Sequence, residues 1–381
     1  MSDVPAEDIK YGLAGVVTDT TAVSKVMHET NSLTYRGYAV QDLCKHADFM
    51  QTAYLLWHGE LPNAAQLDDL VKKERGFRAI SDDLLAVIKL FNKNAHPMDT
   101  IRTAVSFLGQ DDPTTEDASH ESNLEKSVKM LARIPTCIAA DYRCRNGLEP
   151  IAPDASLGFS ENFFNMCFGE VPAQEVIDCF DISMILYAEH SFNASTFAAR
   201  VITSTTSDIY SSVVGGIGAL KGPLHGGANE AVMHMMIEID DPAKAAQWLR
   251  DALASKRKVM GFGHRVYKSG DSRVPTMTEA FYKMAEIKDG AKWVEMSKNL
   301  ADTMIGDKNI YPNLDFPAGP AYYLMGFDIP MFTPLFVMSR ITGWTAHIME
   351  QVTDNKLIRP LSAYVGEEQR DVVPLDQRSA A

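Results

Sequence analysis

Two histidines and one aspartate stand in turns rich in glycine or proline, and their types suit proton transfer at carbon. They are His225, His264 and Asp315, in the segments Gly222–Asn229, Gly261–Tyr267 and Tyr311–Phe316. Glycine beside such a side chain permits a sharp turn and the close approach of another molecule. Two imidazoles and a carboxylate could supply a base, an acid and a donor that polarises a carbonyl. This set predicts the formation of a carbon nucleophile and its addition to a carbonyl.

His225 gains meaning from the residues that follow it. A histidine between glycines is by itself more often a structural turn residue, but Gly226–Val232 indicates the start of a helix. The helix dipole disfavours the cationic imidazolium at that end. A neutral imidazole could then donate a hydrogen bond to a developing enolate oxygen. His264, between Gly263 and Arg265, repeats the pattern of an exposed imidazole on a tight turn.

Another group of residues suits the binding of an anion. His190 and Asn193 lie one turn apart on what we expect to be the continuation of an amphipathic helix. Arg273, Arg340 and Arg359 are spread through the second half, and an isolated arginine is by default a surface charge. Arg340, however, adjoins an apolar helical stripe, so we expect it to be buried beside an anionic partner. Convergent guanidinium groups would bind a dicarboxylate bidentately.

Helical periodicity dominates the elements that must position these residues. The clearest apolar stripe runs over Val337–Val352, with Thr333 as the expected N-cap, Pro334 as the first helical residue and Thr353–Asn355 at the end. The sequence predicts a mainly α protein. Strand signals are few and lie near the N-terminus, where Gly15–Thr21 and Leu33–Tyr38 predict a minor hairpin. We also expect an exposed loop over 110–122 and an extended arm after Gly366.

Flexible points suggest two domains. Glycine or proline clusters occur at Gly215–Gly218, Gly261–Gly263 and Pro312–Gly319, and hinges often lie at such element ends. We therefore expect a large helical domain of residues 1–220 and 321–381 with a smaller helical domain, 221–320, inserted in it. The three catalytic candidates would lie near the cleft between them.

Composition excludes several classes of function. The formal net charge is −14, which argues against broad nucleic-acid or membrane-surface binding. We expect no membrane span and no secretory signal. The five cysteines include no C-x-x-C pair, which predicts reduced thiols, no metal site and a cytoplasmic location. A local basic run, Lys256, Arg257 and Lys258, precedes Gly261 and Gly263 and could bind the phosphates of a cofactor.

The three motifs, in this order, resemble those of the citrate synthase family. The resemblance extends from Tyr35–Tyr38 through His96–Asp99 to Arg359-Pro360, and so covers nearly the whole chain. It implies a mainly α homodimer in which a large dimer-forming domain and a small domain close over the substrates. No tightly bound cofactor is implied, because a coenzyme A thioester is the co-substrate.

The resemblance also implies roles for single residues. His225 would hydrogen-bond the thioester carbonyl and stabilise the enol, and Asp315 would abstract the α-proton of the acyl-CoA. His264 would polarise the ketone of oxaloacetate, and the condensed thioester would then be hydrolysed. The expected oxaloacetate-binding residues are His190, Asn193, Arg273, Arg340 and, from the other subunit, Arg359.

Within the family, Tyr187–Asn193 and Met331–Gln351 resemble the 2-methylcitrate synthase branch, which condenses propionyl-CoA with oxaloacetate. Citrate synthases commonly have Tyr-Ser two residues after the catalytic aspartate, where this chain has Pro317 and Ala318. We therefore expect Tyr187, Pro317 and Ala318 to set acyl specificity. One carbon in an apolar pocket is worth roughly 1–3 kcal/mol. Side activity on acetyl-CoA is expected.

Three alternatives stay open at this stage. The chain could be a citrate synthase that uses mainly acetyl-CoA. The glycine run Gly215, Gly216 and Gly218 could belong to a nicotinamide-dependent oxidoreductase, although no G-x-G-x-x-G pattern or βαβ context surrounds it. The chain could also be a catalytically idle regulator, but all three catalytic candidates are present.

Overall fold

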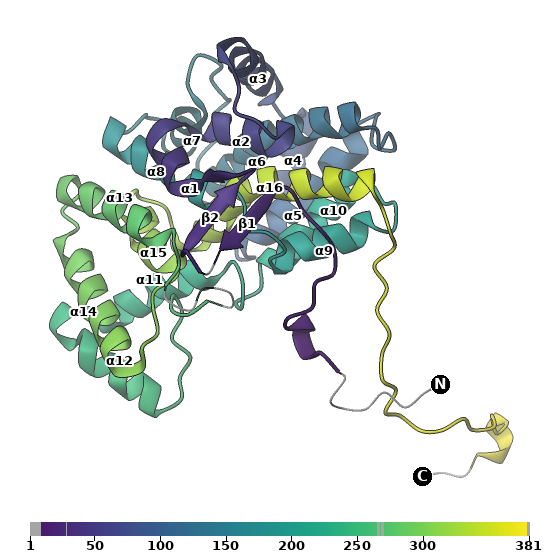
Figure 1. Ribbon diagram of the computed structural model, residues 1–381. Coiled ribbons are helices and arrows are strands. Elements are labelled where there is room, and N and C mark those ends of the chain that lie inside the picture. The colour runs from purple at the N-terminus through teal and green to yellow at the C-terminus, as the bar shows by residue number, and fades with distance from the viewer. Residues whose placement is uncertain (1–8, 28, 265–266, 268–269, 379–381) are drawn as a thin grey trace. The chain divides into compact units, whose positions relative to one another are not determined.

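The computed structural model describes residues 9–27, 29–264, 267 and 270–378, and helices dominate it (Figure 1). The helices are α1 (Val40–His46), α2 (Phe49–His58), α3 (Ala64–Phe77), α4 (Asp82–Leu90), α5 (Pro97–Asp111), α6 (His120–Arg145), α7 (Phe159–Phe168), α8 (Gln174–Tyr187), α9 (Ala194–Thr203), α10 (Ile209–Leu220), α11 (Ala228–Ile239), α12 (Ala245–Ala254), α13 (Val274–Ile287), α14 (Ala291–Lys308), α15 (Asp315–Leu324) and α16 (Phe332–Thr353). The predicted mainly α fold is confirmed. None of the helices in the described residues is long and apolar enough to cross a membrane.

The described chain divides into two compact units. One comprises Thr21–Lys356 and contains the sixteen helices and the sheet. The other comprises the described parts of the two terminal segments, up to Thr20 and from Leu357. Its regular structure among those residues is limited to the short turns Tyr11–Leu13 and Leu375–Gln377. As expected, the segment after Gly366 is exposed and mostly irregular.

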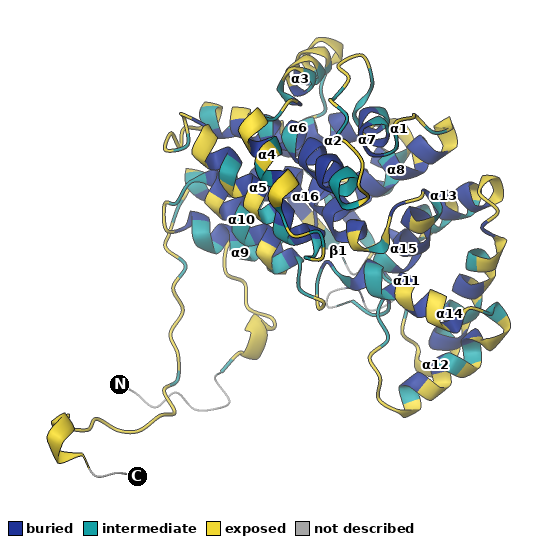
Figure 2. Ribbon diagram, turned by 180° about the vertical axis from the view of Figure 1, so that it is seen from behind, coloured by how far each residue is buried: buried dark blue, intermediate teal, exposed yellow. Residues whose placement is uncertain are grey.

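Helix α16 is the centre of the larger unit. Every residue from Met331 to Met349 is buried, so the helix is covered on all sides by α2, α6, α8, α9 and α10 (Figure 2). A helix that is apolar all round belongs in a core. The predicted end at Thr353 is confirmed, but the predicted start is wrong. The helix begins at Phe332, and Thr333 donates its backbone N–H and its hydroxyl to Glu230 instead of capping.

The glycine run lies in the interior of α10. A Cβ at Gly216 would lie 3.1 Å from Cε2 of Trp344, and one at Gly215 would lie 2.1 Å from Cδ1 of Ile202. The glycines thus allow α10 to approach α16 and α9 closely. The dinucleotide-binding alternative is wrong, because the run lies within a helix and forms no strand-to-helix loop.

The small sheet differs from the predicted hairpin. It has three antiparallel strands in the order β1 (Ser24–Met27), β2 (Ser32–Tyr35) and β3 (Tyr38–Ala39). The described structure contains no strand over Gly15–Thr21, so that part of the prediction is wrong. The second predicted strand is confirmed as β2 and β3. The register pairs Ser24 with Tyr35, which places both side chains on one face.

Helices α11 to α15 gather on one side of the larger unit (Figure 1). Helix α15 packs on α11 and α13, and α12 packs on α14. Helices α11 to α14 lie within the range 221–320 that we expect to form the small domain, and α15 begins in it and ends at Leu324. Helix α13 also packs against α8, so the catalytic candidates lie where this group meets the central helices.

Candidate active site

The turns that carry His264 and Asp315 are hydrogen-bonded to each other. Phe262 and Pro312 form an antiparallel bridge, with the Gly263 N–H 2.8 Å from the Tyr311 carbonyl oxygen. The Asn313 N–H returns a bond to the Gly261 carbonyl at 2.9 Å. Gly261 has φ +85°, and a Cβ there would lie 2.4 Å from a Val232 methyl group. Only glycine fits this position without a shift, so the sequence motif reflects a close crossing of two turns.

His225 lies in the turn directly before α11, as the sequence predicts, with Gly227 as N-cap. Its Nε2 lies 2.8 Å from the Ser195 hydroxyl and accepts the Ser195 backbone N–H at 3.3 Å. Since a backbone N–H can only donate, the proton of the neutral ring belongs on Nδ1. Burial, assisted by the Arg340 charge, lowers the pKa of His225 to about 3. The imidazole is therefore a neutral donor at physiological pH.

His264 has the opposite tautomer. Its Nδ1 accepts the backbone N–H of Tyr267 at 3.2 Å, which assigns the ring proton to Nε2. Burial and then the nearby Arg273 charge lower its pKa to about 4. The ring is half-buried rather than fully exposed as predicted. The site thus holds two neutral imidazoles, each with a donor N–H opposite its backbone contact.

Asp315 is the first residue of α15. The Tyr187 hydroxyl donates to its Oδ1 at 2.7 Å, and the Asn313 side chain accepts its backbone N–H at 3.1 Å. Burial raises the pKa of Asp315 to about 6, against the opposing effects of the Tyr187 hydrogen bond and Arg273. A carboxylate with this pKa is ionised at neutral pH and is a stronger base than an exposed aspartate.

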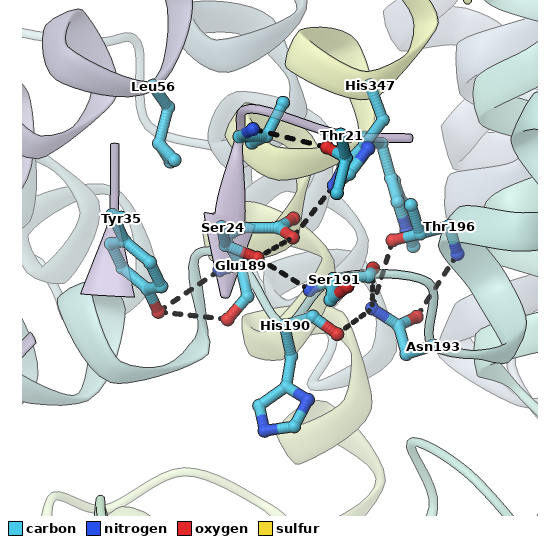
Figure 3. A network of polar contacts seen from close by, with 12 residues as sticks. Thr21, Ser24, Tyr35, Leu56, Glu189, His190, Ser191, Asn193, Thr196 and His347 are labelled. Atoms are coloured by element: carbon cyan, nitrogen blue, oxygen red, sulfur yellow. Dashed lines mark hydrogen bonds and ion pairs between the residues drawn. The ribbon is translucent and has the colours of Figure 1, made fainter. Parts of the chain in front are cut away.

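His190 lies in an irregular loop, not on a continuing helix. Helix α8 ends at Tyr187 and α9 begins at Ala194, so that part of the prediction is wrong. Figure 3 shows the His190 ring pointing away from the polar network around Glu189. Its centroid lies 5.0 Å from that of His264, and its buried Nε2 has no hydrogen-bond partner among the described residues. Burial, with Arg273 next, holds the pKa of His190 well below its usual range.

Arg340 is buried in the middle of α16, as expected from its place beside the apolar stripe. Its Nε donates to the Tyr187 carbonyl at 2.7 Å, and its guanidinium carbon lies 4.7 Å from the centre of the Phe336 ring. Its Nη1 is buried and has no hydrogen-bond partner within the described chain. Burial lowers the pKa of Arg340 to about 10, so it remains a cation. No carboxylate of the described residues forms a direct ion pair with Arg340, which leaves donor capacity for an anionic ligand.

Arg273 is buried beside Asp271, a residue that the sequence analysis missed. The guanidinium donates to Asp271 from Nε at 3.0 Å and from Nη2 at 2.7 Å. The same carboxylate accepts the Leu314 N–H at 3.2 Å, one residue before Asp315. Burial opposes ionisation of Asp271, but Arg273 outweighs it and holds its pKa below the usual value. Asp271 therefore ties the arginine to the turn of the base. In the sequence, an aspartate two residues before an arginine does not indicate that its carboxylate also binds the turn of the catalytic base.

A second missed residue is Ser195, which supports His225. Trp344 donates from Nε1 to the Ser195 hydroxyl at 3.1 Å, from the centre of α16. The indole N–H of Trp344, a residue of the predicted apolar stripe, thus contacts the serine that supports His225. Its signal in the sequence was the tryptophan, whose buried N–H needs an acceptor.

Comparison with known proteins identifies the family. A model described as "Citrate synthase, C-terminal domain" matches residues 12–361. The chain belongs to the citrate synthase family. It is therefore an acyltransferase.

Two curated relatives and one solved structure match this family member over nearly their full length. A 2-methylcitrate synthase of Mycobacterium tuberculosis is 61% identical over 363 residues, covering 95% of this chain and 92% of the relative. A citrate synthase of Mycolicibacterium smegmatis is 59% identical over 368 residues, covering 97% and 98%. The citrate synthase of Thermoplasma acidophilum, solved with carboxymethyl coenzyme A and oxaloacetate, is 33% identical, with coverage of 97% and 100% and a TM-score of 0.93.

The remaining predicted site residues of this citrate synthase family member have varied surroundings. Asn193 caps α9: its Oδ1 accepts the Thr196 N–H at 3.1 Å, and its Nδ2 contacts the His190 carbonyl at 3.4 Å. Arg359 is exposed in the terminal unit. The described residues contain no group of three or more potential ligands that could hold a metal ion.

The basic run predicted to bind phosphates is exposed, but one member is already paired. Lys256 and Lys258 are exposed, whereas Arg257 makes two hydrogen bonds to Glu238, at 2.7 and 2.6 Å. Arg257 also lies 4.8 Å from the Trp248 ring centre. A phosphate would have to compete with that carboxylate for Arg257.

The three predicted acyl-specificity residues lie in different places. Tyr187 contacts Asp315 and packs on Phe336 at a ring distance of 4.2 Å. Pro317 lines a cavity of about 290 Å³ that Asp271 and residues of α13 and α14 also line, and Ala318 is fully buried within α15. Of the three, Tyr187 is the one that touches a catalytic candidate.

Proposed function

We propose that this protein catalyses the 2-methylcitrate synthase reaction, in which propionyl-CoA, oxaloacetate and water give 2-methylcitrate and coenzyme A. The observation that carries the proposal is one arrangement: two neutral imidazoles whose ring protons lie on opposite nitrogens, together with an aspartate of raised pKa. That arrangement suits enolisation of a thioester and activation of a ketone. The high identity to a relative named 2-methylcitrate synthase supports the choice of acyl group.

The first step is removal of the α-proton. The Asp315 carboxylate accepts the proton from the α-carbon of the acyl-CoA, and His225 donates its Nδ1–H to the thioester oxygen. A neutral donor suits the enol, because it can share a proton with the oxygen without carrying a net charge. The Tyr187 hydrogen bond orients Asp315 and opposes the rise of its pKa on burial.

Condensation and hydrolysis follow. His264 donates its Nε2–H to the ketone oxygen of oxaloacetate, and the enol carbon forms a bond to the ketone carbon. The ketone oxygen takes up the Nε2 proton of His264 and becomes the tertiary hydroxyl, and the proton held by Asp315 returns through solvent to restore neutral His264 and ionised Asp315. Water then adds to the thioester carbonyl and the carbon–sulfur bond breaks, which releases coenzyme A as the thiol.

Oxaloacetate binding falls to the buried donors without partners. Among the described residues, the Arg340 Nη1 and the His190 Nε2 are buried without a hydrogen-bond partner, and both could hydrogen-bond a carboxylate or carbonyl oxygen. Arg273 adds positive charge that Asp271 holds in place. Charge-assisted hydrogen bonds of this kind are about twice as strong as neutral ones.

We infer that the active unit is a homodimer in which Arg359 completes the site of the other subunit. Mixing two inactive variants tests this. In a heterodimer of Asp315→Asn and Arg359→Gln, a shared site restores one intact active centre. Recovery of activity after mixing and refolding supports sharing, and its absence would place Arg359 in its own subunit's site or outside the chemistry. The proposal also includes closure of residues 221–320 over the substrates.

Citrate synthesis from acetyl-CoA is the second candidate, because a relative named citrate synthase is 59% identical. Release of the coenzyme A thiol with oxaloacetate and either acyl-CoA decides between the two. We expect kcat/KM to be higher for propionyl-CoA, with measurable turnover of acetyl-CoA. A higher kcat/KM for acetyl-CoA would contradict the proposed acyl preference. The five free cysteines accord with a reducing, cytoplasmic location for either activity.

A further inference from the structure

The small sheet is built against the loop that carries His190. Ser24 of β1 and Tyr35 of β2 are register partners, and both side chains are buried. In the sequence, both residues lie more than 150 positions before the loop between α8 and α9. Figure 3 shows both side chains directed at Glu189 and Ser191, the two neighbours of His190.

The Tyr35 hydroxyl holds the N-terminal side of the loop. It lies 3.0 Å from the carbonyl oxygens of Ile185 and Glu189 and 3.3 Å from that of Leu186. It also accepts the Glu189 N–H at 3.2 Å. Burial raises the pKa of Tyr35, so the hydroxyl keeps its proton. The single hydroxyl proton can be donated to one of these carbonyls at a time, while the hydroxyl oxygen accepts the Glu189 N–H, so Tyr35 contacts the end of α8 and both backbone groups of Glu189.

The Ser24 hydroxyl holds the other side of the loop. It accepts the Ser191 N–H at 2.9 Å and donates to Glu189 Oε1 at 2.8 Å. That carboxylate oxygen also lies 2.8 Å from Nε2 of His347 in α16. The loop is thus tied to the sheet and to the central helix at once.

The backbone of this loop needs such support. Ser191 has φ +51°, in the left-handed region that is unfavourable for residues other than glycine. Such conformations persist where the surroundings fix them, and they cluster at binding sites. His190 stands between the two tied residues, while its own Nε2 has no partner among the described residues. The contacts therefore fix where the imidazole lies and leave its donor or acceptor atom for a ligand.

We propose that Tyr35 and Ser24 are positioning residues for oxaloacetate binding, and that they act through His190. This rests on the proposed function, in which His190 binds oxaloacetate. On this proposal the sheet contributes to the affinity for oxaloacetate. It does not contribute to acyl-CoA binding or to proton removal by Asp315.

The test replaces the Tyr35 hydroxyl and leaves the ring. Tyr35→Phe should raise KM for oxaloacetate on the order of tenfold, the effect expected from losing a buried hydrogen-bonding group that orders a binding residue. The value of kcat at saturating oxaloacetate and KM for propionyl-CoA should change less than twofold. Titration calorimetry with oxaloacetate should show the same loss of affinity.

Tyr38→Phe is the matched control. Tyr38 lies on the adjoining strand β3, and its hydroxyl contacts only the exposed Glu60, at 3.1 Å. It should leave all three parameters unchanged. Ser24→Ala should also weaken oxaloacetate binding, and Ser24→Thr, which keeps the hydroxyl, should restore it. An equal effect of Tyr35→Phe and Tyr38→Phe, or a lowered melting temperature with unchanged KM, would overturn the proposal.

A double-mutant cycle separates this proposal from the proposed function. His190→Gln alone should raise KM for oxaloacetate, and adding Tyr35→Phe to it should raise KM no further, because residues that act through one group are not additive. Full additivity overturns the positioning role. If His190→Gln leaves oxaloacetate affinity unchanged, the assignment of His190 in the proposed function is wrong, and the positioning proposal is overturned with it.

Discussion

The catalytic turns and the oxaloacetate-binding residues are built in different ways. His264 and Asp315 stand on two turns joined by backbone hydrogen bonds, with glycine where the chains cross. His190 and Arg340 come instead from a tied loop and from the most buried helix of the molecule. The turns of His264 and Asp315 are thus joined by backbone hydrogen bonds, whereas side-chain hydrogen bonds and packing hold the groups that bind the substrate.

This difference teaches how each region resists change. A turn fixed by backbone bonds tolerates substitution of its side chains, so loss of a catalytic group there should slow the chemistry while the fold and oxaloacetate binding are kept. A buried arginine is part of the packing, so its loss affects binding and structure together. Each prediction below tests one side of this division.

The largest expected effect concerns the base. Asp315→Asn should lower kcat roughly 10²- to 10⁴-fold, the contribution typical of a positioned general base, while oxaloacetate affinity stays within a factor of two. Exchange of the propionyl-CoA α-protons with solvent deuterium, followed by NMR, is the direct measurement. Retained exchange would show that the base lies elsewhere.

A smaller effect is expected from a change in the buried residues that bind oxaloacetate. Arg340→Gln should raise KM for oxaloacetate about 10- to 100-fold, because hydrogen bonds to charged groups contribute roughly 1.5–3 kcal/mol. Initial rates over a range of oxaloacetate concentrations measure it. Arg102, which is partly exposed and pairs with Asp99 at 3.0 Å, supplies the control Arg102→Gln. If only kcat fell, Arg340 would belong with the chemistry and not with binding.

The tyrosine that bridges the two regions should affect pH dependence. The reaction needs ionised Asp315, so kcat should rise with pH through about 6. The Tyr187 hydrogen bond lowers the Asp315 pKa, so Tyr187→Phe should move this rise to higher pH. A pH–rate profile measures the shift. Tyr210→Phe removes a similar hydroxyl from Asp112, at 2.7 Å, and should leave the profile in place. An unchanged profile for Tyr187→Phe would contradict the role of the hydrogen bond.

The smallest expected effect is on stability. Because folding raises the Asp315 pKa from 3.8 to about 6, the stability linked to this group is present below pH 3.8 and is lost as pH rises through 6. Asp315→Asn should therefore be more stable than the parent at pH 8, by on the order of 2 kcal/mol, and no more stable near pH 4. Urea unfolding at the two pH values provides the comparison. Equal gains at both would show that the charge is not the cause.

Sequence patterns predict the turns that carry His264 and Asp315 better than the surroundings of His190 and Arg340. Glycine and proline marked the catalytic turns because only they permit those backbones, and the apolar stripe marked α16. The start of α16 was missed because Thr333 bonds to Glu230, a contact made across more than 100 residues. Asp271, Ser195 and the loop of His190 were missed for the same reason: long-range hydrogen bonds leave no local period.

The burial of α16 on every side has a consequence for hydrogen exchange. Its amide hydrogens can meet solvent deuterium only when the surrounding helices separate, so they should be among the slowest to exchange. Arg340 and Trp344 both belong to this helix. Local openings of the turns would then expose His264 and Asp315 while the residues of α16 stay in place.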